Sequence, residues 1–456
     1  MLTATAARRI CRLALAEAAR LSGASASVTL TSAHGGNTRF AVGEVTQVVD
    51  SEEVTLEVAI SFGQRRAAAS TNQLGAAGVA DVVARAARLA RLSPPSPDVL
   101  PPLGPQRYLA SLGAVDAEAA RLGAAGRAAA IKQALALAEA AGVVLAGFYQ
   151  HARLSTSLAT SAGLWVHDER TRLACSCSAR TRDGDGSGWA GAASHRAAEL
   201  QPAALASTAI AKAQASARPA RLAPGRYSVV LEPAATAALV RFLTESIDAR
   251  SAHEGSSWLS QRAGGAGGAG SAGGFGGRLG QRVLPESITV ASDPADYAAD
   301  GRAFDAEGVP QAPTTWIDRG VLARMATDRS WAAKSGQPLT GWPEGMRLEG
   351  GTATRDQLIR GIDRGLLITR FFYLGLLDPT SLQVTGLTRD GVFLIERGAL
   401  VGPVQNFRFN HSPVELLARC DGLGATQVVA IDGGRRLRAP LLRSHDFHMT
   451  SVSEAV

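Results

Sequence analysis

Lysine and aromatic residues are scarce in this 456-residue sequence. Only three of its 47 basic residues are lysines, and aromatic side chains make up 5% of the chain. The arginines that supply most of the net charge of +7 are scattered, and no run of five or more basic residues occurs. Proteins that bind nucleic acids usually cluster basic side chains among stacking aromatic residues. The composition therefore predicts no nucleic-acid partner.

Long apolar runs are also missing. No stretch of 18 or more uncharged apolar residues occurs, which argues against a membrane-spanning helix. The N-terminal "MLTATAARRICRLALAEAARLSG" carries Arg12 and Glu17 where a secretory signal needs an apolar core, so it predicts an amphipathic helix instead. We expect a cytoplasmic protein that does not associate with a membrane.

Cysteine is rare, and its spacing excludes two kinds of site. The four cysteines are Cys11, Cys175, Cys177 and Cys420, and none forms a CxxC pair. Neither a zinc ribbon nor a dithiol redox motif is therefore supported. Cys175 and Cys177 alternate with Leu173, which predicts a strand that carries all three as small hydrophobic residues on one face.

The remaining pattern indicates an α+β protein of two domains. Residues 1–218 alternate helical and strand segments, which predicts an N-terminal α/β domain. Residues 219–456 are predicted to form a C-terminal β-rich domain of antiparallel sheet. In the first domain, period-two alternation predicts a strand over Val54–Phe62, and helices are expected over Gly78–Leu92, Asp116–Ala141 and "PAALASTAIAKAQAS".

In the second domain, "TTWIDRGVLARM" and "VFLIERGALVGP" each place an acidic-Arg-Gly turn between two apolar runs. This pattern predicts two β-hairpins, and Arg355–Ile368 is expected to be a helix between them. The tract 263–280 contains ten glycines. Its GxGxxG match at Gly265–Gly270 neither follows a strand nor opens a helix, so a flexible linker or mobile loop is expected; a lid over a cleft is the alternative.

A further helix is predicted over residues 233–250. Leu239 and Leu243 recur four residues apart and give it a core-facing stripe. Arg241 and Glu245 occupy the other face at the same spacing. Such a pair is more typical of a solvated, weakly ion-paired surface than of a catalytic site.

The stretch "SAHEGSSWL" after this helix contains His253 and Glu254 but no second histidine at the spacing of a zinc helix. Two adjacent side chains point in different directions and do not easily share one ion. We therefore expect His253 and Glu254 to cap or line a turn. Together with Ser256 and Ser257, they are the candidates for substrate contact.

Several longer stretches stand in an order and spacing that extend over most of the chain. They include "NTRFAVGEVTQ" (Asn37–Gln47), "PGRYSVVLEPAATAALVRFL" (Pro224–Leu243), "EGSSWL" (Glu254–Leu259) and "VFLIERGALVGPVQNFRFN" (Val392–Asn410). On these stretches the chain resembles the TldD/PmbA family, in which PmbA is also called TldE. The resemblance implies a two-domain fold and a cytoplasmic, dimeric protease system. In that system the TldD-type subunit holds zinc on an HExxxH helix with a cysteine near the C-terminus, and the PmbA-type subunit lacks these ligands.

Aligned on the Gly-Ser-Ser of the family, the three motif positions read Val240, Arg241 and Glu245. Valine and arginine do not bind zinc, and arginine does not replace a glutamate general base. The position of the family's cysteine falls near "VAIDGGRRLRAPL", which has no thiol, and Cys420 lies about ten residues too early. The degenerate helix and the missing cysteine together imply the PmbA/TldE-like type, with no cofactor in this chain.

The C-terminal "RSHDFHMTSVSEAV" offers a competing site. His445 and His448 are three residues apart. On a helix they would share a face, but alternation with Phe447 predicts a strand that points them to opposite faces. Together with His253 they are the candidates for an alternative metal site. The competing interpretation is a terminal strand that only carries polar side chains.

Three functional hypotheses follow. The leading one is a PmbA/TldE-like subunit that contributes the peptide cleft and a dimer interface, with zinc expected in a TldD-like partner that together with it processes or degrades peptides. The second is a divergent metallopeptidase that uses His253, His445 and His448. The third is a homodimeric peptide-binding protein without a protease partner.

Overall fold

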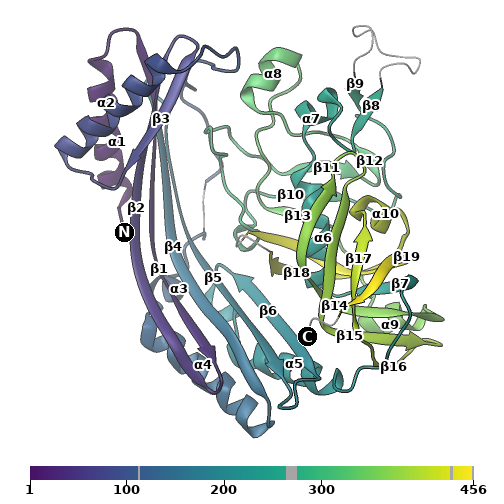
Figure 1. Cartoon of the computed structure of the whole chain (residues 1–456). Coiled ribbons are helices and arrows are strands. Elements are labelled where there is room, and N and C mark those ends of the chain that lie inside the picture. The colour runs from purple at the N-terminus through teal and green to yellow at the C-terminus, as the bar shows by residue number, and fades with distance from the viewer. Residues whose placement is uncertain (111–112, 263–274, 432–434, 454–456) are drawn as a thin grey trace.

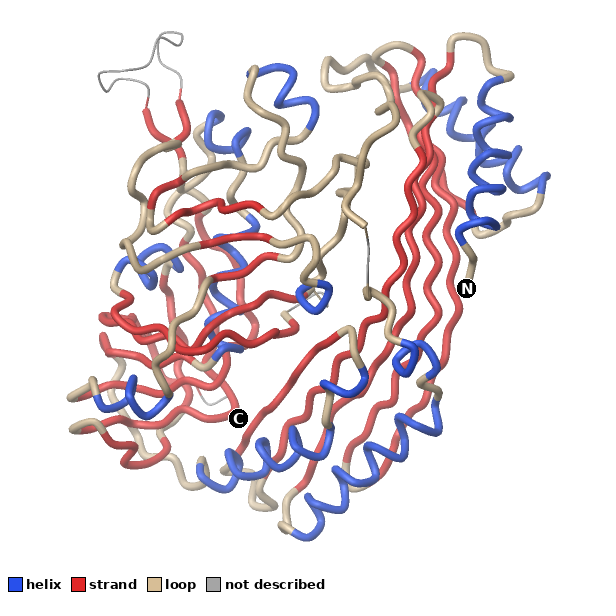
Figure 2. The backbone as a smooth tube through the Cα atoms, turned by 180° about the vertical axis from the view of Figure 1, so that it is seen from behind, coloured by secondary structure: helices blue, strands red, loops and turns tan. Residues whose placement is uncertain are grey.

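The computed structural model contains two large β-sheets, one from each half of the chain (Figure 1). It describes residues 1–110, 113–262, 275–431 and 435–453. Figure 2 shows the long strands of the N-terminal sheet beside the more compact C-terminal half. The α+β class predicted from the sequence is confirmed. The boundary at residues 218 and 219 remains a prediction; it falls where the chain passes from the first sheet to the second.

The N-terminal sheet is a six-stranded antiparallel sheet in the order β3-β2-β1-β4-β5-β6. Its central strands are long, and each pairs with its neighbour over most of its length. The predicted strand at Val54–Phe62 is the end of β2. The strands are β1 (Ala24–Ala41), β2 (Glu44–Phe62), β3 (Arg65–Thr71), β4 (Val144–Thr160), β5 (Trp165–Arg180) and β6 (Ser187–Ser194).

Helices cover one face of this sheet and form two hydrophobic clusters with it. The first cluster packs two helices on side chains such as Val28 and Leu56, and the second packs three further helices on residues that include Leu173, Cys175 and Cys177. The predicted common face of these last three residues is confirmed. The expected helix at Asp116–Ala141 is broken in two. The helices are α1 (Ala4–Ala19), α2 (Ala76–Leu92), α3 (Ala117–Arg121), α4 (Ala124–Ala140) and α5 (Pro202–Ala215).

Because side chains alternate along a strand, the other face of the N-terminal sheet carries a different set of residues. The long strands bend so that this second face turns toward the C-terminal half of the chain (Figure 1). Residues such as Phe148 and Trp189 therefore lie between the two halves.

The C-terminal sheet has eleven strands and is mixed rather than purely antiparallel. Most neighbours are antiparallel, but β7 (Gly225–Leu231) pairs in parallel with β14 (Arg364–Asp378). β7 also pairs with β19 (Arg436–Ser453), so the pairings β7-β14-β15-β17-β19-β7 close a ring. The other strands are β10 (Val290–Ser292), β11 (Thr314–Asp318), β12 (Val321–Leu322), β13 (Met346–Leu348), β15 (Gln383–Glu396), β16 (Ala399–Pro403), β17 (Asn406–His411) and β18 (Cys420–Ala430).

Both predicted hairpins are present, as β11–β12 and β15–β16. In each turn an arginine and the following glycine have positive φ angles, 41° and 79° at Arg319 and Gly320 and 50° and 74° at Arg397 and Gly398. Positive φ at both central residues is the turn geometry that matches the twist of paired strands. The Arg-Gly pair was therefore a reliable local signal.

The helix expected over Arg355–Ile368 is wrong in its second half. Only α9 (Arg355–Arg360) is helical, and Thr354 caps it with a complete capping box. The apolar run that follows joins the sheet as the buried start of β14, because Leu366, Leu367 and Ile368 pair with β7.

The remaining C-terminal elements surround the sheet. The ends of the glycine-rich tract form a small separate hairpin, whereas the expected linker or lid itself, residues 263–274, lies outside the described residues. No helix of the described chain is both long and apolar enough to cross a membrane. These elements are α6 (Pro233–Glu245), α7 (Ala249–Glu254), β8 (Ser260–Arg262), β9 (Phe275–Gly277), α8 (Arg329–Ser335) and α10 (Pro413–Ala418).

Charged contacts hold the two halves together. Arg172 of β5 binds the carboxylate of Asp300 at 2.6 Å, and the Arg436 backbone N–H donates to the same carboxylate at 2.9 Å. Lys212 of α5 forms a 2.5 Å ion pair with Glu232, the residue that precedes α6. These contacts fix α6 relative to the N-terminal sheet.

Candidate functional site

Helix α6 carries the degenerate motif, and its position decides what the motif residues can do. Pro233 begins the helix at the position where a missing N–H costs nothing. Leu239, Val240 and Leu243 are fully buried in the C-terminal core. The opposite side, marked by Ala238 and Arg241, lines a cavity.

The three motif positions do not fit a zinc ion. Val240 has no donor atom and is enclosed by the core. The guanidinium of Arg241 is a cation, and it lies 4.4 Å from the ring centre of Phe242. Glu245 binds Arg435 at 2.9 Å. Zinc requires neutral or anionic donors that converge on one point, and this set does not supply them.

The cavity that Arg241 lines has a volume of about 450 Å³, within the usual range for ligand sites. It lies between the helix-free face of the N-terminal sheet and the C-terminal half. One wall comes from β4, β5 and β6, and the other from α6, β14 and the end of β18. The walls include Phe148, Gln150, Trp189, Ala238, Arg241, Arg370, Phe372, Ala430 and Ile431.

Arg370 is held in this cavity by aromatic rings. Its guanidinium carbon lies 5.0 Å from the ring centre of Trp189 and 5.7 Å from that of Phe372. Its Nε lies 3.4 Å from the carboxylate of the buried Asp390. Arginine on an aromatic face is stabilised by the ring quadrupole and loses mobility. The arrangement places an oriented cation between the two halves of the protein.

Two further hollows each share a lining residue with the cavity. Gln150 also lines a hollow of about 280 Å³ on the N-terminal sheet, and Ile431 also lines a small one beside Glu245 and Arg435. Glu344 lines this small hollow, and burial raises the pKa of its carboxyl. The first of these hollows is lined by residues of the N-terminal half and the second by residues of the C-terminal half, so each adjoins the cavity from one side.

The region of the family's cysteine meets α6 here. Arg435 and Ile431 come from "VAIDGGRRLRAPL", of which residues 432–434 lie outside the described part. Cys420 is instead buried at the start of β18, and burial raises the pKa of its thiol to about 11. Its Sγ contacts the Gly422 carbonyl, so it serves as a core residue.

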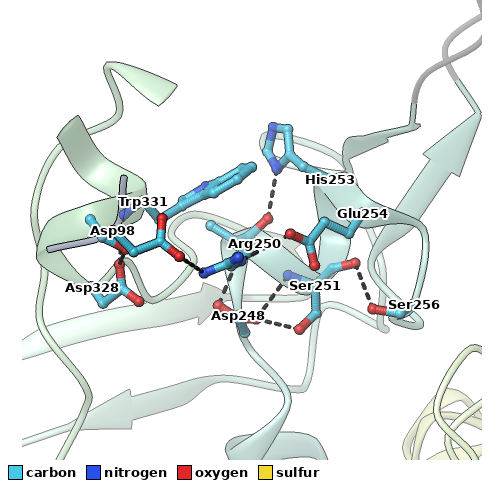
Figure 3. Close-up of polar contacts among 11 residues, drawn as sticks. Asp98, Asp248, Arg250, Ser251, His253, Glu254, Ser256, Asp328 and Trp331 are labelled. Carbon is cyan, nitrogen blue, oxygen red and sulfur yellow. Dashed lines mark hydrogen bonds and ion pairs between the residues drawn. The ribbon is translucent and has the colours of Figure 1, made fainter. Parts of the chain in front are cut away.

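The candidates around His253 lie on and after α7 (Figure 3), and none of them lines the cavity. The Nδ1 atom of His253 contacts the Ala249 carbonyl at 2.7 Å, and its ring lies 5.5 Å from Trp331. Glu254 binds Arg250 at 2.9 Å, one helical turn earlier. Each side chain is thus engaged in a local contact.

Arg250 extends this network to the N-terminal half, because it also reaches Asp98 at 3.2 Å. The two serines stabilise the turn that ends α7: Ser256 contacts the Ser251 carbonyl at 3.3 Å, and Ser257 accepts from the Leu259 N–H at 3.2 Å. We find no shared ligand-facing surface for His253, Glu254, Ser256 and Ser257 in the contacts of the described chain.

The C-terminal histidines lie on β19, as predicted, but the expectation of opposite faces is wrong. Asp446 has a φ of 61° and forms a bulge between Ser444 and Phe447. The extra residue keeps His445 and His448 on the same, less buried side.

His445 lies between Ser228 and Asp421, at 2.9 Å from each. This Ser-His-Asp arrangement forms no sequence motif, because its three residues come from three separate strands. Both Nε and Nη2 of Arg443 donate to the same Asp421 carboxylate, and the imidazole of His445 is about 40% exposed. No group of three His, Cys, Asp or Glu residues in the described chain is arranged to hold a metal. The geometry therefore gives no support to the hypothesis of a metal site at His253, His445 and His448.

The residues that sequence reasoning missed are those that line the cavity, above all Trp189 and Arg370. They lie far apart in the chain, and neither belongs to a recognisable motif. The one sequence signal was Arg241, a cation on the polar face of α6. Its spacing from Glu245 predicts a solvated surface residue, but Arg241 lines the cavity instead.

Comparison with known proteins gives a consistent result. A family profile for the PmbA/TldA metallopeptidase C-terminal domain matches residues 224–451, and one for the central domain matches residues 114–217. A curated metalloprotease of Methanothermobacter thermautotrophicus is 27% identical over 161 residues, which cover 32% of this chain and 35% of that protein. The chain thus matches about a third of the length of this relative.

Three solved structures share the fold over nearly the whole chain, each with a TM-score of 0.83. A proposed modulator of a DNA gyrase from Thermotoga maritima is 18% identical, with 96% of this chain and 99% of that chain covered. A proposed modulator of DNA gyrase from Bacteroides thetaiotaomicron is 19% identical, with 99% and 100% covered. TldE from Thermococcus kodakarensis is 17% identical, with 98% and 99% covered.

Proposed function

Because the chain belongs to the metallopeptidase-related PmbA/TldD family, we propose that it is a PmbA/TldE-type subunit of a peptide-processing system. In this system it binds the peptide, and a TldD-like partner subunit supplies the catalytic zinc. The observation that carries the proposal is the environment of the motif helix. Val240 is buried in the core, Arg241 faces the cavity, and Glu245 is paired with Arg435.

The cavity suits an extended peptide. It lies between the two halves, a hollow adjoins it on each half, and its walls combine aromatic rings with a few polar groups. Such a composition is usual for sites that bind small ligands or short segments. The partner's zinc would activate the water for hydrolysis, a function that the α6 side chains of this chain do not supply.

Strand β18 offers a backbone edge beside the cavity. One edge of β18 pairs with β19, and Val429 and Ala430 at its end line the cavity. Near its start the outer edge is bridged at Gly424, but no other strand of the described chain pairs with residues 427–430. A peptide that adds here as a strand would be held through backbone hydrogen bonds, which accept many sequences.

The test compares the full chain purified alone with the chain co-expressed with a TldD-like protein that has an intact HExxxH motif. We expect zinc only in the pair, at about one ion per pair, and peptidase activity only there. The matched control is the same pair with the first motif histidine of the partner changed to alanine, which should lose both zinc and activity. Stoichiometric zinc with peptidase activity in the single chain would overturn the proposal.

The same preparations separate the third hypothesis from the first. A chain that binds peptides, forms a homodimer and never associates with the TldD-like protein would be a stand-alone peptide-binding protein. Size-exclusion chromatography of the co-expressed pair provides the measurement. We expect a complex that contains both chains.

A further inference from the structure

The cavity between the two halves has an unusual balance of charge. Arg241 and Arg370 both line it, and its described wall contains no aspartate or glutamate. The other polar side chains on the wall include Gln150 and Ser176, which are uncharged. A cavity with cationic side chains and low-dielectric walls concentrates a field that attracts anions.

The two arginines come from independent elements and are positioned by different contacts. Arg370, on β14, is oriented by Trp189, Phe372 and Asp390. Arg241, on α6, lies against the ring of Phe242. A guanidinium has five N–H donors, so contacts such as that of Arg370 Nε with Asp390 are compatible with a second acceptor at the other nitrogens.

The aromatic rings and guanidinium groups that line this cavity together match a particular chemical group. Arginine binds carboxylates through two parallel N–H···O bonds, which are stronger and more directional than neutral hydrogen bonds. Phe148 and Trp189 lie on the facing wall and offer apolar surface to the carbon atoms beside such a group. The positive charge of the two guanidinium groups disfavours a cationic ligand.

We propose that this cavity is a carboxylate subsite, in which Arg241 and Arg370 bind an acidic group of the peptide. The inference rests on the proposed peptide-binding function and assigns its substrate class. The carboxylate has two sources, the C-terminus of the peptide and an Asp or Glu side chain. In either case the subsite sets the register of the peptide along β18, because the cavity includes Ala430.

Direct binding of labelled peptides tests the subsite. The probes are three pools of fluorescein-labelled octapeptides. The first lacks Asp and Glu and has a free C-terminus, the second is the same pool amidated, and the third is amidated with one Glu. Fluorescence polarisation is measured with the full chain and with its complex. We expect a carboxylate pool to bind about 10- to 100-fold more tightly than the neutral pool, as charged hydrogen bonds imply.

Comparison of the first and third pools identifies the source of the carboxylate. Preference for the first assigns a C-terminal carboxylate, and preference for the third assigns a side chain. In the Arg241→Gln and Arg370→Gln variants, the ratio of affinities between the carboxylate and neutral pools should fall toward one. The Arg370→Lys variant should keep part of this preference. The matched control is Arg20→Gln, which removes one positive charge from a 74% exposed side chain just after α1 and should change nothing.

The outcomes separate the two proposals. Equal binding of all three pools by the wild-type chain overturns the carboxylate subsite and leaves the peptide-binding function intact. Absence of peptide binding by both chain and complex overturns the function itself and the subsite with it. If Arg370→Gln fails to fold because Asp390 loses its partner, the Arg241→Gln variant alone tests the carboxylate subsite.

Discussion

The contact between Asp300 and three arginines leads to a quantitative prediction. Asp300 accepts hydrogen bonds from Arg172 at 2.6 Å and from the Arg436 backbone, and its own carbonyl accepts from Arg170 at 3.4 Å. Burial lowers the pKa of Arg170 to about 10 and that of Arg436 to about 9. The carboxylate thus stabilises cations that are otherwise poorly solvated.

Asp300→Asn keeps the shape and an acceptor oxygen, and asparagine tolerates the φ of 65° at this position. Only the negative charge is lost. Breaking a buried ion pair from one side costs about 3–5 kcal/mol, because the partner cations remain buried without compensation. We expect the free energy of unfolding to fall by about 3 kcal/mol or more, measured by urea denaturation with tryptophan fluorescence.

The control is Asp318→Asn, whose side chain is 60% exposed and lies 4.0 Å from its arginine. This change should stay within about 0.5 kcal/mol. The double variant Asp300→Asn with Arg172→Gln should recover part of the loss, with a coupling energy of about 1–3 kcal/mol. A cost at Asp300 no larger than that at Asp318 would refute the view that this contact joins the two halves.

Three further outcomes are expected. Burial lowers the pKa of His411 from 6.5 to about 4, so below pH 6.5 the unfolded chain gains a proton that the folded chain does not. His411→Phe should therefore remove about 2 kcal/mol of the stability loss between pH 7.5 and pH 5 in urea titrations; an unchanged pH slope would contradict this. Gly280→Ala should cost about 1–2 kcal/mol for its φ of 78° alone, whereas Gly320→Ala, whose Cβ would lie 2.0 Å from a carbonyl oxygen, should cost clearly more in the same denaturation assay. All four cysteines are buried, and burial raises the pKa of Cys11 to about 12 and that of Cys420 to about 11, so iodoacetamide at pH 8 should label them only after unfolding, as mass spectrometry would show.

Local chemistry determined which elements could be predicted. The Arg-Gly turns at Arg319 and Arg397 fix the hairpins within a few residues, so the pattern sufficed. The segment after Arg360 failed because a short apolar run fits a helix or a buried strand equally well, and pairing with β7 decided it. The bulge at Asp446 left no sequence signal, because aspartate adopts positive φ only in particular contexts.

In the candidate site too, local residue chemistry could be interpreted from the sequence, whereas long-range contacts could not. The absence of a zinc motif in this chain stays a prediction, which rests on Val240 and Arg241 because the chemistry of these side chains excludes them as zinc ligands. The cavity could not be inferred, because Trp189 and Arg370 belong to different sheets and meet only when the two halves dock. Docking depends on long-range contacts such as that of Arg172 with Asp300, which no local pattern reveals.

The closed ring of strands has a consequence for protein synthesis. β7 and β19, which close the ring, are separated by roughly 200 residues, and such distant contacts form slowly. On the ribosome, the N-terminal sheet can complete once β6 has emerged, whereas the ring must wait for the last strand. The cavity needs both walls, so a nascent chain would acquire the proposed peptide-binding site only after β19 has emerged. Incomplete chains would then be unable to capture the peptides around them.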